Sequence, residues 1–166
     1  TVIIRPSVVC GNEDNFTNLF AKLSLFPVIP VVKPNYKFQP ILVDDVATAI
    51  VKAIEIKKNE GKIYEIGGPT IISFKDMVKS IISTIGKKRF IIEMPMPLAK
   101  VQAALFSLMP KPLLTKDQCE ILNEANNTVS SNHLTLKDLN IKPIDVQKSM
   151  SKWLWRFRKG GEFAKI

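Results

Sequence analysis

The chain has 166 residues, 46% of them hydrophobic, and a formal net charge of +9 at pH 7. This length and apolar content support one folded unit with a buried core and exclude a disordered chain. The excess of cations favours an anionic partner, but it is spread along the chain, so we do not expect a nucleic-acid-binding protein. No apolar run reaches the roughly 18 residues that span a bilayer.

The first segment, 1–11, is dense in Val and Ile and ends in a Gly turn. Such a run needs cover on both faces, as in a parallel sheet of an α/β protein. Most of that sheet is not in this chain. We therefore expect the chain to be the later part of a longer protein.

The next segments alternate between helical and extended patterns. Residues 12–15 offer helix-capping side chains, and apolar residues then repeat at helical spacing up to Phe26-Pro27. Residues 28–32 predict an edge strand or an extended loop, because Pro30 interrupts them. Residues 36–43 predict an extended segment.

Asp44 and Asp45 stand where the apolar period changes from strand to helix. A pair of acids is a candidate for general acid catalysis. However, adjacent residues at such a junction point apart, so we interpret them as helix caps.

A strand is predicted at 62–66, closed by the turn Gly67-Gly68-Pro69. Ser73 and Asp76 then resemble a capping box, and a helix follows that ends at Gly86. The last predicted strand is at 89–95.

The remaining segments are helical and interrupted by Pro. Helices are predicted at 97–109, 116–126 and 146–158, with a short turn at 136–140. The first of these helices is apolar around most of its circumference. The last has an apolar stripe flanked by cations: Val146, Met150, Trp153, Leu154 and Phe157. Each helix either packs on the α/β core or lies on an anionic membrane, because Trp beside basic residues suits a lipid headgroup layer.

No metal site is predicted. Cys10 and Cys119 have neither the spacing nor the neighbours of metal ligands, and we interpret them as packed, reduced thiols. The single histidine, His133, has no acidic neighbour in sequence and is interpreted as a solvated loop side chain.

Three segments together resemble a known family. In chain order they are Arg5-Pro6-Ser7-Val8-Val9, residues 38–47 and Tyr64-Glu65-Ile66-Gly67-Gly68. They resemble the C-terminal half of extended short-chain dehydrogenases/reductases, the NAD(P)-dependent epimerase/dehydratase family. Residues 114–118 and 153–163 are similar to the branch related to the NAD(P)H-binding accessory subunit of respiratory complex I.

This resemblance implies the C-terminal part of a Rossmann-like, doubly wound parallel sheet plus a mostly helical small substrate lobe. We expect residues 1–95 to supply the last sheet strands with part of the lobe, and residues 96–166 the helical lobe and tail. The family's Gly-rich pyrophosphate turn and its active-site Tyr and Lys are not in this chain. Gly67-Gly68 lacks the third Gly and is interpreted as a turn at a strand end.

The resemblance also implies site residues. Pro6, Ser7, Val8 and Val9 would contact the nicotinamide end of NAD(P) in the complete protein. Asn15, Phe16, Gln39 and Pro40 would border a substrate cleft, although packing explains Phe16, and a solvent-facing strand position explains Gln39. No catalytic residue is predicted.

We therefore expect a fragment of an NAD(P)-binding protein associated with complex I (NADH:ubiquinone oxidoreductase) or a quinone-related assembly. Its partners would be the N-terminal Rossmann half and complex I subunits. This fragment alone would neither bind NAD(P) nor act as an enzyme. The alternatives are the substrate-binding half of an active epimerase, dehydratase or reductase, and a non-functional remnant of a split gene. The expected location is the cytoplasm or the inner face of the inner membrane.

Overall fold

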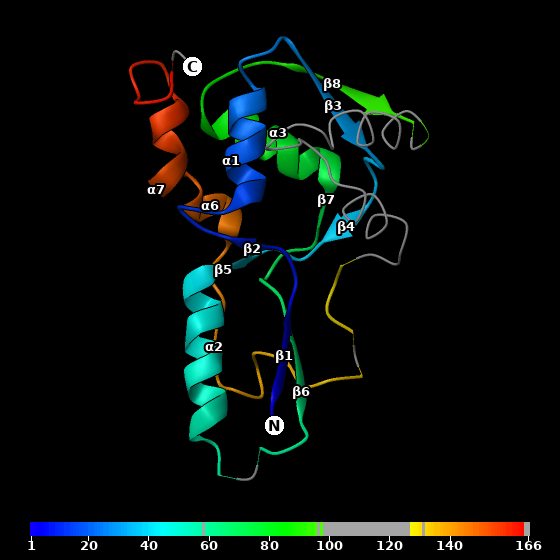
Figure 1. Cartoon of the computed structure of the whole chain (residues 1–166), viewed down its shortest axis with the longest axis vertical. Coiled ribbons are helices and arrows are strands. Elements are labelled where there is room, and N and C mark those ends of the chain that lie inside the picture. The colour runs from blue at the N-terminus through cyan, green and yellow to red at the C-terminus, as the bar shows by residue number, and fades with distance from the viewer. Residues whose placement is uncertain (58, 96, 98–126, 131, 165–166) are drawn as a thin grey trace, which may run out of the picture.

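A computed structural model of the chain combines helices with short strands (Figure 1), and it describes residues 1–57, 59–95, 97, 127–130 and 132–164. The strands are β1 (Ile3–Pro6), β2 (Val9–Cys10), β3 (Val28–Val32), β4 (Lys37–Phe38), β5 (Ile41–Leu42), β6 (Ile63–Ile66), β7 (Ile72–Ser73) and β8 (Phe90–Met94). The helices are α1 (Asn15–Leu23), α2 (Val43–Glu55), α3 (Phe74–Thr84), α6 (Val146–Ser149), α7 (Ser151–Leu154) and the 3-10 turn η1 (Trp155–Phe157).

The strands associate mainly in parallel. β1 pairs with β6, β2 with β5 and β3 with β8, all in parallel, while β4 and β7 are antiparallel. In the β1–β6 pair, Ile3 lies opposite Ile63 and Pro6 opposite Ile66. Helix α2 lies in sequence between these two strands, as a crossover connection between parallel strands requires. The predicted α/β fold with parallel strands is confirmed.

Among its described residues, the chain has two clusters of buried hydrophobic residues, and the helices that carry them, α2 for one and α1 with α3 for the other, lie toward opposite ends of the molecule in Figure 1. One forms between α2, the β1–β6 pair and the segment 134–141, with Tyr64 and Ile66 at its centre. The other joins α1, α3, β3 and the α6–α7 segment. The predicted division at residue 95 remains a prediction, and both cores contain residues from either side of it.

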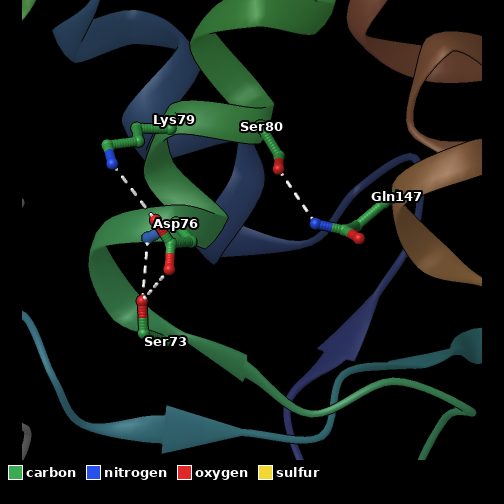
Figure 2. A network of polar contacts seen from close by, with 5 residues as sticks. All are labelled: Ser73, Asp76, Lys79, Ser80 and Gln147. Atoms are coloured by element: carbon green, nitrogen blue, oxygen red, sulfur yellow. Dashed lines mark hydrogen bonds and ion pairs between the residues drawn. The ribbon is translucent and has the colours of Figure 1, made fainter.

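Two helices begin at the predicted caps. Asp14 accepts a hydrogen bond from the Thr17 backbone N–H at 2.5 Å at the start of α1. Ser73 accepts from the Asp76 backbone N–H at 3.1 Å and donates to the Asp76 carboxylate at 2.6 Å at the start of α3. Figure 2 shows this reciprocal pair, with Lys79 one turn further on and 3.2 Å from Asp76. Both capping predictions are confirmed.

The capping prediction for Asp44 and Asp45 is wrong. Helix α2 already begins at Val43, and its N-cap, Leu42, has no side-chain capping bond. The two acids therefore lie in the first turn, where their charge still suits the positive end of the helix dipole. Asp45 is buried, and its Oδ2 accepts from the Ile144 backbone N–H at 2.9 Å. It joins α2 to the segment that precedes α6.

The C-terminal segment, predicted as one helix, is divided into α6, α7 and η1. All five residues of its apolar stripe are buried, each at 6% exposure or less. Trp153 also donates from its indole Nε1 to the Thr17 Oγ1 at 3.0 Å. In Figure 2, Gln147 of α6 reaches Ser80 of α3, with 2.9 Å between Nε2 and Oγ. Packing on the core therefore explains this stripe, so the stripe itself does not lie on a membrane, and membrane contact through the flanking cations remains a prediction.

The predicted helices at 97–109 and 116–126 lie almost wholly outside the described residues. Within the described part of the chain, no helix combines the length and the apolarity needed to cross a bilayer.

We predict that Asp45→Ala lowers the free energy of unfolding by about 1 to 2 kcal/mol more than Asp44→Ala does. Both changes remove a first-turn charge, but only Asp45 holds a backbone N–H of a distant segment. Chemical denaturation of the two variants measures the difference. Equal losses would mean that the bond to Ile144 adds nothing beyond the helix dipole.

Candidate functional site

The end of strand β1 borders a hollow of about 220 Å³, here called the β1 hollow. Pro6 is exposed at its rim, and Ser7 is buried in its wall. Its lining comprises Arg5, Pro6, Ser7, Glu65, Ile66, Asn127, Thr128 and Val129. Two of the four predicted cofactor-contacting residues therefore share one concave surface, which is formed by three segments that are distant in sequence.

Ser7 connects these segments. Its backbone N–H donates to the Ile66 carbonyl at 2.9 Å, which continues the β1–β6 ladder. Its Oγ donates to the Asn127 carbonyl at 2.7 Å and accepts from the Gln39 N–H at 3.1 Å. Because these bonds occupy the hydroxyl, Ser7 offers a ligand a rigid wall more than a free polar group.

Val8 and Val9 lie one step further along the chain. Val8 packs against the larger core, and its carbonyl accepts from the Ile41 N–H at 2.9 Å. Val9 pairs with Ile41 in the β2–β5 ladder. The Val8 carbonyl is therefore already used in a backbone hydrogen bond. Val9, besides its pairing with Ile41, lines a second hollow.

This second hollow, the β2 hollow, has a volume of about 670 Å³ and contains two of the predicted cleft residues, Asn15 and Phe16. Among the described residues, its lining is Val9, Cys10, Gly11, Asn12, Glu13, Asp14, Asn15, Phe16 and Val43. Asp14 shapes the loop by accepting from the Gly11 N–H at 3.1 Å as well as from Thr17. The carboxylate therefore fixes the loop wall and the helix start together.

Phe16 is half-buried in an aromatic cluster, and Asn15 is exposed at the first turn of α1. The Phe16 ring centroid lies 5.2 Å from that of Phe20 and 5.6 Å from those of Phe38 and Phe74. Packing against these rings therefore explains the buried part of the Phe16 side chain. The rest of its surface lines the β2 hollow.

Gln39 does not face solvent, so that interpretation is wrong. Its Nε2 donates to the Gly68 carbonyl at 2.9 Å, and its Oε1 accepts from the Val129 N–H at 3.0 Å. Pro40 is buried, and a Cβ on Gly68 would lie 2.0 Å from the Pro40 carbonyl oxygen. The Gly-Gly turn is thus a close backbone approach at a strand end. Gln39 and Pro40 support the β1 hollow from behind and do not join Asn15 and Phe16.

Glu65 is a polar centre that the sequence reasoning missed. Its Oε2 accepts from the Ser130 N–H at 2.9 Å and from the Ser130 Oγ at 2.6 Å. The Arg5 guanidinium lies 3.9 Å and the His133 Nε2 3.6 Å from the Glu65 Oε1, so His133 has an acidic neighbour in space although it has none in sequence. The bonds from Ser130, with smaller contributions from His133 and Arg5, hold the pKa of Glu65 below its ordinary value.

The signal for this centre was present in the strand pattern. Alternation along 62–66 buries Tyr64 and Ile66 and turns Glu65 to the opposite face. Its partners Ser130 and His133, however, come from a loop whose position only the tertiary structure gives.

Cys10 is completely buried where β2 meets the β2 hollow. Burial, and secondarily the charge of Asp14, raises the pKa of its thiol to about 12. This agrees with the interpretation of Cys10 as a packed thiol, because a protonated, buried thiol is a poor nucleophile. Cys119 lies outside the described residues.

A third hollow of about 490 Å³ separates α2 from the C-terminal segment, and we call it the C-terminal hollow. Its lining includes the cations Lys152 and Arg156, the acids Asp44 and Glu162, and Trp155. Arg156 donates to the Asn12 carbonyl and, at 2.9 Å, to the Asn18 Oδ1. It thereby ties the C-terminal segment to the loop that also lines the β2 hollow.

No family model matches the chain. Its fold, however, is the Rossmann-like fold of NAD-dependent epimerases and dehydratases. UDP-glucose 4-epimerase from Thermus thermophilus, solved as a complex with NAD, matches with a TM-score of 0.62 at 16% identity, over 94% of this chain and 46% of that one.

The relatives found by sequence similarity indicate a narrower group of proteins than the structural match does. The chain is 32% identical over 162 residues to the mitochondrial NADH dehydrogenase (ubiquinone) 1 alpha subcomplex subunit 9 of Mus musculus, covering 95% of this chain and 42% of the relative. The Arabidopsis thaliana subunit is 30% identical over 171 aligned positions, covering 96% of this chain and 42% of the relative. The predicted resemblance to the complex I branch is confirmed, and the chain spans less than half the length of these relatives.

We predict that Ser130→Ala raises the pKa of Glu65 toward its ordinary value, and by more than His133→Ala does. Ser130 supplies the largest contribution to the lowered pKa, and His133 only a smaller one. Because the folded pKa is lowered, this contact stabilises the fold above the ordinary carboxyl pKa, and its contribution disappears as pH falls through the lowered value. Carboxyl titration followed by NMR measures both variants. A larger shift in His133→Ala would identify the ion pair as the main cause.

We predict that Cys10 alkylates by about three orders of magnitude more slowly in the folded protein than in denaturant at pH 8, because the reactive thiolate falls tenfold per pKa unit. The raised pKa of about 12 sets this difference. A Cys119→Ser background isolates the Cys10 signal in an iodoacetamide time course. Similar rates in the folded and denatured protein would contradict a protonated, enclosed thiol.

Proposed function

We propose that this chain is the C-terminal part of an NAD(P)-binding accessory protein of a respiratory NADH:quinone oxidoreductase. The near-complete coverage of the chain by the subunit 9 relatives is the observation that carries this proposal. In the complete protein, NAD(P)(H) would serve as a bound structural group. The chain itself contributes one wall of the nicotinamide end of the site.

The edge of strand β1, free among the described residues, supports the proposal that further strands of the parallel sheet lie outside this chain. The far edge of β6 is already occupied, since Glu65 N–H donates to the Leu134 carbonyl at 2.8 Å and Leu134 N–H donates to Ile63 at 3.2 Å. Within the described residues, β1 pairs only with β6. We therefore propose that an added parallel strand joins this pair at β1.

The outer face of α2 supports the same conclusion. Ala49 and Ala53 are buried against the strands, while large apolar side chains point outward: Val43 at 49% exposure, Ile50 at 43%, Val51 at 56% and Ile54 at 76%. A parallel sheet carries neighbouring helices on each face, so a helix of the missing N-terminal half would cover this stripe. That half would also bring the Gly-rich turn that a pyrophosphate requires.

The proposed cofactor contacts are Pro6, Ser7, Val8 and Val9. Pro6 and Ser7 line the β1 hollow, and bonds to Asn127 and Gln39 hold Ser7 in place. A wall fixed in this way positions a nicotinamide without supplying a catalytic group. The proposed substrate-cleft residues are Asn15 and Phe16 at the β2 hollow, with Gln39 and Pro40 supporting the wall behind β1.

The proposed location is the inner face of a respiratory membrane, where a protein of this kind would meet the other subunits. The curated relatives carry mitochondrial names.

We predict that the longer protein carrying this chain, affinity-tagged in its native host, comigrates with NADH dehydrogenase activity on native gels of mildly solubilised membranes. It should also retain NAD(P)(H) through purification, because the nucleotide would be structural. An untagged strain is the control. A tagged protein that migrates alone and converts a nucleotide sugar with bound NAD would instead identify an active epimerase or dehydratase.

A further inference from the structure

The C-terminal segment from α6 to residue 159 has two different faces. Its apolar side chains are buried in the larger core, as described above. Its exposed residues make up what we call the basic face: Lys148 in α6, Lys152 in α7, Trp155 in η1, and Arg158 and Lys159 directly after η1. Figure 1 shows this segment at the periphery of the molecule, beside α1.

Trp155 is unusual in this setting. It is 56% exposed, whereas Trp153, two residues earlier, is 6% exposed and bonded to Thr17. A large aromatic side chain with an apolar body and one N–H donor favours a boundary between an apolar phase and water. The fold thus buries one Trp of the pair and presents the other to the surroundings.

The charges around Trp155 are mainly positive. Between residues 145 and 162 there are five Lys and Arg residues and two acids, Asp145 and Glu162, which leaves three net positive charges. None of the ion pairs within the described residues uses these five cations. Lys152 shares the C-terminal hollow with Asp44 and Glu162, while Lys148 is exposed one turn earlier.

We propose that the basic face binds the surface of an anionic phospholipid bilayer, with Trp155 in the headgroup layer and the lysines on lipid phosphates. A single exposed Trp beside exposed lysines matches an interface between water and lipid. A single-stranded nucleic acid would instead favour several aromatic platforms in a row. The inference deepens the proposed membrane-associated role and rests on it for its biological setting, but not for its test.

The test is sedimentation of the longer protein carrying this chain with vesicles. Vesicles of phosphatidylcholine containing about a third phosphatidylglycerol should bind it at low salt, and pure phosphatidylcholine should not. Binding should fall steeply at about 1 M salt, where the screening length is about 3 Å. The double variant Lys148→Ala/Lys152→Ala should bind roughly 25-fold more weakly, since each lysine near an anionic surface contributes about fivefold. The single variant Trp155→Ala should also bind the anionic vesicles more weakly than the unchanged protein does.

Matched controls lie elsewhere on the surface. Lys22→Ala/Lys75→Ala removes two exposed lysines from α1 and α3, and Phe26→Ala removes an exposed apolar side chain from the segment after α1. Both should bind as the unchanged protein does. Thermal unfolding of every variant confirms that the exposed substitutions leave the fold intact.

Three outcomes would overturn the inference: no binding to anionic vesicles at low salt, equal weakening by the control variants, or preference for an oligonucleotide over vesicles. Vesicle binding by a protein that does not comigrate with NADH dehydrogenase would uphold the lipid surface and reject the proposed assembly. Comigration without vesicle binding would do the reverse.

Discussion

The hydrogen bonds of the Ser7 hydroxyl and the Gln39 side chain join the strand ends that form the β1 hollow. The arrangement of the segments around this hollow depends on them. Ser7 binds Asn127 and Gln39 at the point where β1 ends. Gln39 in turn spans from Gly68 to Val129. Three strand ends and the returning chain at Asn127 are thereby fixed within one network of short hydrogen bonds. Buried polar networks of this kind stabilise a fold only when every member finds a partner.

This network explains why the turn after β6 contains two glycines. Gly68 passes so close to the Pro40 carbonyl that a Cβ would lie 2.0 Å from it, and a Cβ on Gly67 would meet the Gln39 side chain at 2.8 Å. A side chain at either position would displace the strand end that forms the β1 hollow. Close packing of the backbone therefore explains Gly67 and Gly68 without a bound phosphate.

Hydrogen bonds connect the C-terminal segment to the wall of the β2 hollow. Trp153 reaches Thr17, Thr17 donates to Asp14, and Asp14 receives the Gly11 N–H, so a chain of hydrogen bonds runs from α7 to the wall of the β2 hollow. Arg156 adds a second connection to the same loop. The shape of that hollow consequently depends on residues more than 130 positions away in sequence.

The sequence by itself determined the α/β class, the strands around Ile4 and Tyr64, the helix starts at Asp14 and Ser73, and the resemblance that the relatives confirm. These follow from local signals: apolar periodicity, capping side chains and turn glycines act within a few residues. Only the tertiary structure decided the partner of Asp45, the role of Gln39, the environment of Glu65 and that the apolar stripe of the C-terminal segment packs on the core. Those properties depend on contacts between segments far apart in the chain, such as Asp45 with Ile144 and Glu65 with Ser130. A local pattern shows that a side chain can accept a hydrogen bond, but the fold determines which donor reaches it.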